Sequence, residues 1–285
     1  MPIPISEALE EAGDLAAAKV EQVKRLPRYL LSSAFAGAYV GVAVVLLVSV
    51  AGPLAASGSP ATKLVQGAVF GVALTLVVFA GAELFTGNAM YLLQGLFARK
   101  VRARDLGAVW VASLFGNLVG SVGFAALVHG GGTLDGGPGA ALVATITEAK
   151  HAATGPQLFW RSVLCNMLVC LALWMAARTR SDGAKLVVMW WALLAFIASG
   201  FEHSVANMTI FALGVFEGSA TWAELGRNLM WTVPGNVVGG GLLIGLGYSW
   251  IGTLRPVPVS VPPATGDTPA VEPTAAPLPP VPAAV

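Results

Sequence analysis

A short polar segment interrupts one of the most apolar stretches of this 285-residue chain. The segment GFEHSVANM, residues 200–208, carries Glu202, His203 and Asn207 between the apolar runs VVMWWALLAFIAS and TIFALGVF. Histidine can exchange a proton near neutral pH, and a glutamate buried without partners would cost several kcal/mol. Ionisable side chains inside long apolar segments face a cavity or a functional path, so we expect a polar path at this position.

The composition places the chain among membrane proteins with several spans. Hydrophobic residues make up 56% of the chain, charged residues make up 11%, and the mean hydropathy is +0.75. A compact soluble globule needs more polar surface than this composition supplies. This composition predicts contact with a lipid bilayer. The net charge of +1 provides no basic stripe for phosphates, so we expect no nucleic-acid partner.

Six apolar segments each reach the roughly 20 residues needed to cross the hydrocarbon core. They lie near residues 29–51, 64–98, 106–129, 157–177, 186–216 and 228–251. An even number of spans puts both termini on one side of the membrane. Lysine and arginine residues gather at alternate ends of the segments, and the positive-inside rule therefore predicts that both termini are cytoplasmic.

The chain divides into three predicted regions. Residues 1–27 contain apolar side chains at three- and four-residue spacing, which predicts an amphipathic N-terminal helix on the cytoplasmic face. Residues 28–252 form the six-span transmembrane domain. Residues 253–285 are rich in proline and alanine, and this composition predicts a disordered cytoplasmic tail.

Two of the predicted spans are too long for a straight helix across the membrane. The 35 residues of segment 64–98 would reach about 52 Å at 1.5 Å per residue, against about 30 Å of hydrocarbon. Segment 186–216 has the same excess, and each segment holds a single acid, Glu83 or Glu202. A break in each helix explains the excess length, and the polar clusters lie where such breaks would fall.

The two polar clusters match each other in sequence. GAELFTGN at residues 81–88 and GFEHSVAN at 200–207 share Gly, Glu and Asn in one register, displaced by 119 residues. The same displacement relates GNLVG at 116–120 to GNVVG at 235–239. Three spans in each half require the halves to be inverted, as in transporters whose broken helices meet near the midplane. We therefore predict an all-α membrane protein of six transmembrane helices in two inverted three-helix repeats, with two helices broken mid-membrane.

These motifs resemble the formate/nitrite transporter family. The resemblance rests on LFTGN at residues 84–88, GFEHSVANM, CNMLVCLALWM at 165–175 and the two GN motifs, and it covers residues 29–250. The run at 190–213 is most similar to the nitrite-channel (NirC) subgroup. The resemblance implies a homopentamer with an aquaporin-like fold and one pore per protomer in the bacterial inner membrane. It also implies transport of small monovalent anions, chiefly nitrite and also formate, without a cofactor or enzymatic activity.

The family pattern also assigns roles to individual residues. The resemblance implies that His203 is the central pore histidine and that Lys150 draws anions into the outer vestibule. We expect the substrate pore to contain His203, Thr86, Asn166 and Lys150, the apolar constrictions to contain Phe70, Leu74, Leu84, Phe85, Val169 and Phe196, and the supporting polar residues to be Glu83, Glu202, Asn88 and Asn207. The two glutamates are expected to accept hydrogen bonds from amides that the helix breaks leave free.

A histidine in an apolar neck offers two ways to move an anion. Burial disfavours the cationic ring, whereas an arriving anion favours it. The anion can take a proton and cross as the neutral acid, or it can cross as an ion beside a transient imidazolium. The sequence leaves both routes open. Helix N-termini at the two breaks would add partial positive charge near the centre.

Other functions fit parts of the pattern. A neutral-solute channel of aquaporin type shares the inverted repeat but does not need Lys150, and a hydrosulfide channel shares the anion path. A membrane enzyme with Glu202 and His203 as acid and base would need a nucleophile or a metal. One histidine within a span leaves too few ligands for a metal, and no soluble-enzyme motif is present. In the structural alternative, His203 only packs in the helix break.

Overall fold

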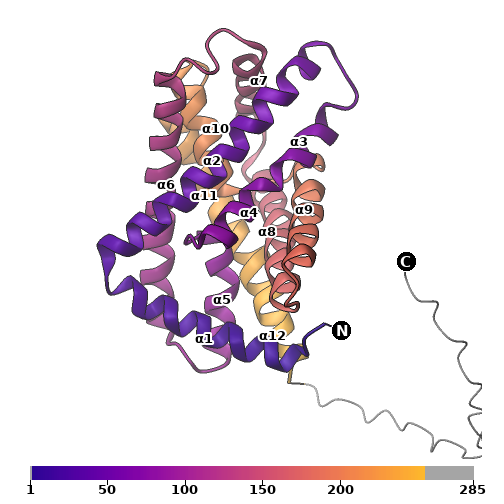
Figure 1. Cartoon of the computed structure of the whole chain (residues 1–285). Helices are drawn as coiled ribbons and strands as arrows, with labels where there is room; N and C mark the ends of the chain where they lie inside the picture. Colours follow the sequence, from indigo (N-terminus) through magenta and orange to yellow (C-terminus); the bar gives the residue numbers. More distant parts are fainter. Residues whose placement is uncertain (1, 254–285) are drawn as a thin grey trace, which may run out of the picture. The chain divides into compact units, whose positions relative to one another are not determined.

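The computed structural model of the chain describes residues 2–253 as an all-helical bundle (Figure 1). In chain order the elements are α1 (Ile5–Val23), α2 (Leu26–Ala56), α3 (Thr62–Phe70), α4 (Val72–Ala80), α5 (Phe85–Phe97), α6 (Ala103–Gly130), α7 (Pro138–Ala152), α8 (Gly155–Ala177), α9 (Asp182–Ala198), α10 (Ser204–Phe216), α11 (Trp222–Asn236), the π-helix η1 (Val237–Leu246) and α12 (Gly247–Ile251). The all-α class predicted from the sequence is confirmed. The predicted tail, 253–285, lies outside the described residues except for Thr253.

Five stretches of helix within the described residues are long and apolar enough to cross a membrane. They are Leu26–Ala56, Thr62–Ala80, Ala103–Gly130, Gly155–Ala177 and Trp222–Ile251. The predicted span 186–216 is divided into α9 and α10, of 17 and 13 residues, and neither reaches that length alone. The predicted span 64–98 is divided into α3, α4 and α5. The protein is therefore a multi-pass membrane protein in which neither over-long segment is one continuous helix.

A glycine in the left-handed conformation marks each interruption. Gly81 follows α4 with φ of 76°, and Gly200 follows α9 with φ of 73°. Only glycine adopts this conformation without a steric cost, and it commonly ends helices. The chain then runs without helix until Phe85 begins α5 and Ser204 begins α10.

Helices α2 and α6 approach each other so closely that only glycine fits at the contact. A Cβ atom on Gly120 of α6 would lie 1.8 Å from the carbonyl oxygen of Ala34 on α2. In the second half of the chain, a Cβ atom on Gly239 of η1 would lie 2.0 Å from the carbonyl oxygen of Val163 on α8. Small residues permit this backbone contact, and the resulting van der Waals packing is what associates helices in a membrane.

The last long helix is widened into the π-helix η1 in its middle. A Cβ atom on Gly240 would lie 2.3 Å from the Asn166 side chain on α8, and one on Gly241 would lie 3.0 Å from the carbonyl oxygen of Ala89 on α5. π-Helical turns are rare and frequently lie at functional sites. The glycine-rich η1 therefore packs closely against both α5 and α8.

Helix α1 lies across one end of the bundle, and α7 lies near the opposite end (Figure 1). We refer to these as the α1 end and the α7 end. The buried face of α1 consists mainly of alanine side chains. Three of its acids pair with basic residues from loops at the same end: Asp14 with Lys100 at 2.5 Å, Glu7 with Arg180 at 3.4 Å, and Glu11 also with Arg180. Helix α1 thus falls in the region predicted to be an amphipathic helix and is held to the α1 end by small side chains and ion pairs.

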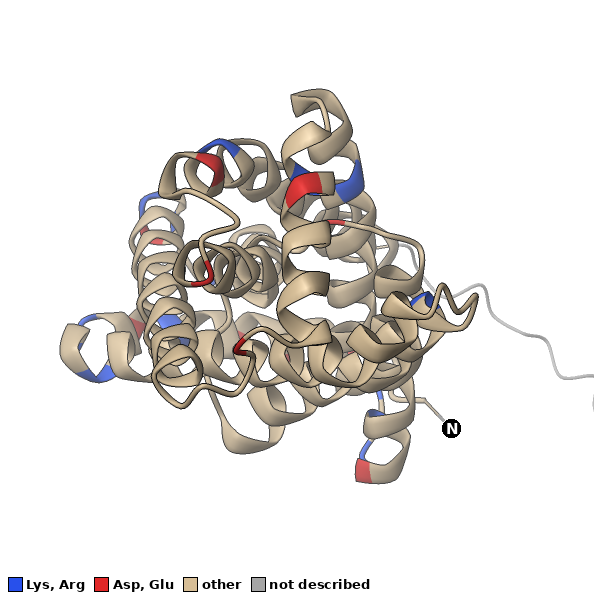
Figure 2. Cartoon of the chain, turned by 90° about the horizontal axis from the view of Figure 1, so that it is seen from above, with Lys and Arg blue, Asp and Glu red and all other residues tan. Residues whose placement is uncertain are grey.

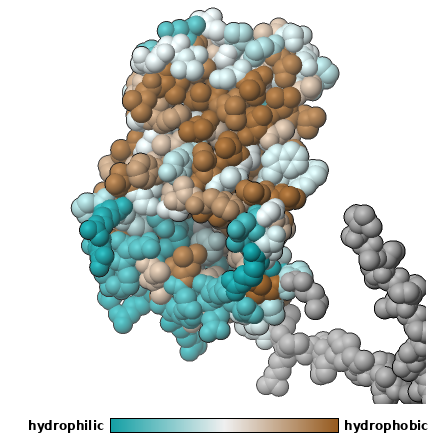
Figure 3. Space-filling view, viewed as in Figure 1, coloured by the Kyte–Doolittle hydropathy of each residue, from teal (hydrophilic) through white to brown (hydrophobic). Residues whose placement is uncertain are grey.

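The outer surface of the bundle is largely apolar between its ends. Apolar residues cover most of the visible face, and hydrophilic residues gather at the α1 end (Figure 3). Viewed from above, charged residues occupy only scattered positions on the helices (Figure 2). Large exposed side chains include Val111, Phe115 and Leu127 on α6, with 70%, 56% and 75% of their surface accessible. Such a surface is suited to lipid or to a neighbouring subunit.

The α2–α6 contact predicts a specific sensitivity to one methyl group. Gly120→Ala should destabilise the protein by about 1–3 kcal/mol, because its Cβ atom overlaps a backbone oxygen that cannot move without separating the helices. Gly123→Ala is the matched control on the same helix, since a Cβ atom there meets nothing within 4 Å. Monodisperse protein remaining after heating in detergent, followed by size-exclusion chromatography, measures the difference. Equal stability of the two variants would contradict the close approach.

Candidate functional site

The starts of two short helices meet in the interior of the bundle. Thr86 lies in the first turn of α5, and His203 is the N-cap residue of α10. The Thr86 hydroxyl oxygen lies 3.1 Å from Nε2 of His203, so a hydrogen bond joins the two helix starts. Helix N-termini carry free N–H groups and partial positive charge. The arrangement therefore brings two positive helix ends and a histidine to one place.

Asn117 holds the break before α5. Its side-chain oxygen accepts a hydrogen bond from the backbone N–H of Phe85 at 2.9 Å. Its side-chain nitrogen donates to the carbonyl oxygens of Ser33 at 2.8 Å and Glu83 at 2.9 Å. One buried amide thus satisfies two backbone groups that the interruption leaves without partners, at Phe85 and Glu83, and ties them to Ser33 within α2.

Asn236 holds the break before α10 in the same way. Its side-chain oxygen accepts from the backbone N–H of Ser204 at 2.9 Å, and its nitrogen donates to the carbonyl oxygens of Ser162 at 2.8 Å and Glu202 at 3.1 Å. The two glutamates were expected to accept these amides, but among the described residues Glu83 and Glu202 accept hydrogen bonds from side chains only, and the two asparagines satisfy the breaks instead. The repeated GN motif, displaced by 119 residues, was the signal that could have identified them.

The hydrogen bonds of His203 define its neutral tautomer. Nδ1 accepts a hydrogen bond from the backbone N–H of Ala206 at 3.1 Å, so the ring proton resides on Nε2 and is donated to Thr86. The ring stacks on Phe196 with a centroid distance of 5.9 Å and an interplanar angle of 20°. The residue is 5% exposed. His203 is therefore held in one orientation with its protonated nitrogen directed at Thr86.

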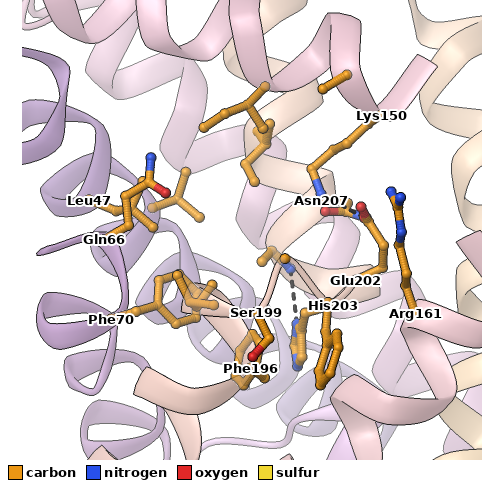
Figure 4. A pocket seen from close by; sticks show the side chains of 18 of the residues that line it. Leu47, Gln66, Phe70, Lys150, Arg161, Phe196, Ser199, Glu202, His203 and Asn207 are labelled. Carbon is orange, nitrogen blue, oxygen red and sulfur yellow. Dashed lines mark hydrogen bonds and ion pairs between the residues drawn. The ribbon is translucent and has the colours of Figure 1, made fainter. Parts of the chain in front are cut away.

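His203 lies between two cavities. The larger has a volume of 380 Å³, opens toward the α7 end and is hereafter the α7-side cavity (Figure 4). The other is a narrow apolar cavity of 10 Å³, about the room that one water molecule occupies. Phe70, Phe196 and His203 line both cavities. The lining of the narrow cavity consists of Val40, Phe70, Ala73, Leu74, Leu84, Val169, Leu193, Phe196 and His203.

The narrow cavity contains most of the predicted constriction residues. Five of the six line it, namely Phe70, Leu74, Leu84, Val169 and Phe196. Phe85 lines neither cavity; it is the first residue of α5, is 2% exposed and donates its amide to Asn117. Its neighbour Leu84 lies in the extended conformation just before the helix and supplies the lining side chain. Val40, Ala73 and Leu193 were missed because nothing distinguishes them from core residues in sequence.

Glu202 is the centre of a buried polar network beside the α7-side cavity. Its Oε2 atom accepts hydrogen bonds from Lys150 Nζ at 2.6 Å and from Asn207 Nδ2 at 2.7 Å. The side chains of Lys150 and Glu202 are 12% and 4% exposed. Lys150 lines the α7-side cavity, and its charge is paired with Glu202; its role in attracting anions stays a prediction.

Glu83 is the centre of a second network, at the α1 end. It accepts hydrogen bonds from Lys19 of α1 at 2.7 Å, and from Tyr29 and Asn88 at 3.2 Å each. Beside it lies a cavity of 280 Å³ whose lining includes Tyr29, Glu83 and Arg28. Lys19 was missed because the sequence analysis counted residues 1–27 as a surface helix. Glu202, which is buried, and Glu83, which is partly buried, are thus each paired with a lysine and an asparagine, so neither carboxylate is left without partners.

The Formate/nitrite transporter family model matches residues 6–250. The chain belongs to the formate/nitrite transporter family. The recognition made from its motifs is confirmed, and the match extends over α1 as well as the apolar helices.

Individual relatives support the assignment to this family. The nitrite transporter NirC of Salmonella typhimurium is 46% identical over 244 residues, which cover 82% of this chain and 87% of that protein. A solved FNT family ion channel superposes with a TM-score of 0.80 at 42% identity and covers 86% of this chain and 98% of its own. A pentameric formate channel solved with formate bound has a TM-score of 0.67 at 28% identity, with 80% and 98% covered.

Asn166 of this formate/nitrite transporter lies behind the site and lines neither cavity. Its side-chain nitrogen donates to the carbonyl oxygens of Thr86 at 3.0 Å and Asn236 at 2.7 Å. The thiol of Cys170, one helical turn further along α8, donates to the same Thr86 carbonyl at 3.3 Å. Asn166 therefore ties α8 to the starts of α5 and η1 and positions Thr86 for its contact with His203.

One group of metal-ligating side chains occurs within residues 2–253 of this transporter, away from the histidine. His129, Asp135 and Glu217 have ligand atoms within 4.8 Å of one another at the ends of α6 and α10. Two of the three residues are exposed. The group shares no residue with the cavities that His203 lines.

The role of Asn236 predicts that it stabilises the fold. Asn236→Ala should lower the free energy of unfolding by at least about 2 kcal/mol, because the Ser204 amide and the Glu202 carbonyl lose their partner in an apolar interior. Ser199→Ala is the matched control in the same break, since Ser199 is exposed and its hydroxyl has no hydrogen bond to the described residues. Thermal unfolding in detergent measures both. An Asn236→Ala variant as stable as the control would remove the asparagine from this role.

Proposed function

We propose that this protein is a transmembrane channel that moves small monovalent anions of weak acids, chiefly nitrite and also formate. The observation that carries the proposal is the position of His203 in the lining of the narrow cavity. Among residues 2–253, it is the one titratable side chain in that lining. A titratable group at an apolar constriction suits a substrate that changes charge as it passes. The likeness to NirC and to a channel solved with formate bound supports these two substrates.

The proposed architecture has six spans in two inverted three-helix repeats within residues 28–252, in an aquaporin-like fold. In this arrangement α3, α4 and α5 form one span broken mid-membrane, and α9 and α10 form the other. The matched hydrogen bonds of Asn117 and Asn236 support it, as does the matched close approach of Gly120 to α2 and of Gly239 to α8. No catalysed reaction is proposed, because the family is one of transporters.

The proposed location is the bacterial inner membrane, with both termini in the cytoplasm. Basic residues support this orientation, because Lys24, Arg25 and Arg28 follow α1, and Lys100 and Arg180 pair with it. The α7-side cavity then faces outward as a vestibule, and the cavity beside Glu83 faces the cytoplasm.

The proposed assembly is a homopentamer with one pore in each protomer. The solved formate channel that superposes on this chain is pentameric. The exposed apolar side chains of α6 supply a surface that a neighbouring subunit can cover. Each protomer has its own His203 and its own pair of cavities, so no pore along the fivefold axis is required.

The proposed mechanism moves the anion through the constriction as a neutral acid. An anion in the α7-side cavity is attracted by the N-termini of α5 and α10 and favours the cationic form of the His203 ring. The ring forms this cation by taking a proton from water of the cavity at Nδ1, where the hydrogen bond from the Ala206 amide is given up. The imidazolium then gives its proton to the anion, and the ring returns to its neutral form. The neutral acid crosses the apolar lining of Phe70, Leu74 and Val169 and releases its proton on the other side. One proton accompanies each anion, so a lower outside pH should accelerate uptake.

Uptake by vesicles reconstituted with the purified protein tests the function directly. Nitrite and formate should enter faster than into protein-free vesicles, and faster still as the outside pH is lowered from 7.5 to about 6, because the proton is a co-substrate. Hydrosulfide and glycerol are measured in parallel. Glycerol uptake that exceeds uptake of both anions would show a neutral-solute channel instead. Uptake of hydrosulfide without uptake of nitrite or formate would make hydrosulfide the substrate in their place.

Replacing His203 tests the mechanism. His203→Leu should lower nitrite and formate uptake by at least about tenfold and remove the acceleration at low pH, because the proton donor at the constriction is lost. His151→Leu is the matched control, since His151 is an exposed histidine outside both cavities. Native mass spectrometry of both variants checks that five chains remain together.

A second substitution at the same position separates proton transfer from packing. His203→Asn retains an acceptor for the Ala206 amide but cannot titrate in this pH range. It should therefore assemble normally and still lose the pH dependence. Wild-type pH dependence in His203→Asn would mean that His203 only holds the helix break.

A further inference from the structure

Within residues 2–253, one half-buried basic side chain in the lining of the α7-side cavity has no acid paired with it. Three basic residues line the cavity, namely Lys63, Lys150 and Arg161. Lys150 is bonded to Glu202, and Lys63 is exposed. Among residues 2–253, no carboxylate oxygen lies within 4.0 Å of the Arg161 guanidinium, and that group donates no hydrogen bond. Arg161 is therefore the half-buried positive charge of this cavity that is free to bind something else.

Arg161 is also held close to the helix break that carries His203. Its backbone carbonyl accepts a hydrogen bond from the backbone N–H of Glu202 at 3.3 Å, one residue before the histidine. Its side chain lies on the same side of the cavity as Lys150 and Glu202, facing Gln66 across it (Figure 4). Glu202 does not pair with Arg161: its Oε2 atom already binds Lys150 and Asn207, and neither of its carboxylate oxygens lies within 4.0 Å of the guanidinium.

We propose that Arg161 forms an anion-capture site in the α7-side cavity, which binds a planar monovalent oxyanion before the anion reaches His203. The inference rests on the proposed function and adds a residue to which neither the motifs nor the Lys150 assignment points. Lys63, at the exposed rim, adds attraction that salt screens, and the side-chain amide of Gln66 can donate a further hydrogen bond.

The geometry of the guanidinium selects the class of anion. Its N–H donors form a planar fork that matches two oxygens of one planar group, so nitrite and formate can each accept two parallel hydrogen bonds. A hydrosulfide or halide ion has a single acceptor atom and gains only the charge. The fork should therefore discriminate in favour of two-oxygen anions, whereas a lysine at this position would attract all monovalent anions alike.

The test compares initial uptake rates over a range of substrate concentrations in vesicles at low ionic strength. Arg161→Gln should raise the KM for nitrite and formate about fivefold with little change in the maximal rate, because the capture site is lost and the constriction is intact. Arg161→Lys keeps the charge but loses the planar fork. Its KM for nitrite should therefore lie between those of Arg161→Gln and the wild type. If hydrosulfide is carried, its KM in Arg161→Lys should equal the wild-type value. Raising the salt concentration should reduce the difference between Arg161→Gln and wild type.

A control variant separates local binding from the general field of the protein. Glu148→Gln changes one charge on α7 outside the cavity, and its KM for nitrite should stay within a factor of about two of the wild-type value. An unchanged KM in Arg161→Gln, or a fall in KM of equal size in Glu148→Gln, would overturn the proposal while wild-type uptake of nitrite and formate still supported the function. Absence of wild-type uptake would instead remove the function.

Protection of Arg161 from phenylglyoxal by nitrite supplies a test that needs no variant. Mass spectrometry of the wild-type protein measures the modification, and no protection would also overturn the site.

Discussion

Two helix breaks inside apolar segments leave backbone groups that water cannot reach, and the rest of the site depends on how those groups are satisfied. An unpaired amide in such surroundings costs several kcal/mol. Asn117 and Asn236 each supply one acceptor and two donors to the break and to the helix beside it. Each asparagine thereby joins three elements at one point. This is why the starts of α5 and α10 can lie in the interior without unfolding their first turns.

The breaks also decide the electrostatics of the path. Two helix N-termini and one hydrogen-bonded histidine meet where the cavities adjoin. A helix end contributes roughly 0.3–1 kcal/mol to a nearby anion, rising to about 2 kcal/mol when partly buried. Transfer of a bare carboxylate-like ion into an apolar neck costs far more than that. Proton transfer removes the larger cost altogether, and for this reason the neutral-acid route is the better physical account of a constriction lined by Phe70, Leu74 and Val169.

The two glutamates near the helix breaks are each paired with a basic side chain. Glu202 and Glu83 each bind a lysine and an asparagine, although Lys150 comes from α7 and Lys19 from α1. The pairing makes both glutamates compatible with a neighbouring anion, since neither presents an unopposed negative charge. Because Lys150 pairs with Glu202, its charge is not free to attract an anion. Among the described residues, Arg161 is the half-buried cation of the cavity without an acidic partner.

The sequence by itself determined the membrane class, the two interruptions and the presence of a histidine at the second of them, because composition, segment length and the Gly–Glu–Asn repeat are local properties. Only the tertiary structure decided what completes the site. Asn117 acts 32 positions from Phe85, and Lys19 acts 64 positions from Glu83, so their roles exist only once distant helices pack. The choice of Leu84 over Phe85 in the constriction has the same origin, because adjacent side chains at a helix start point in different directions and packing selects the one that faces the cavity.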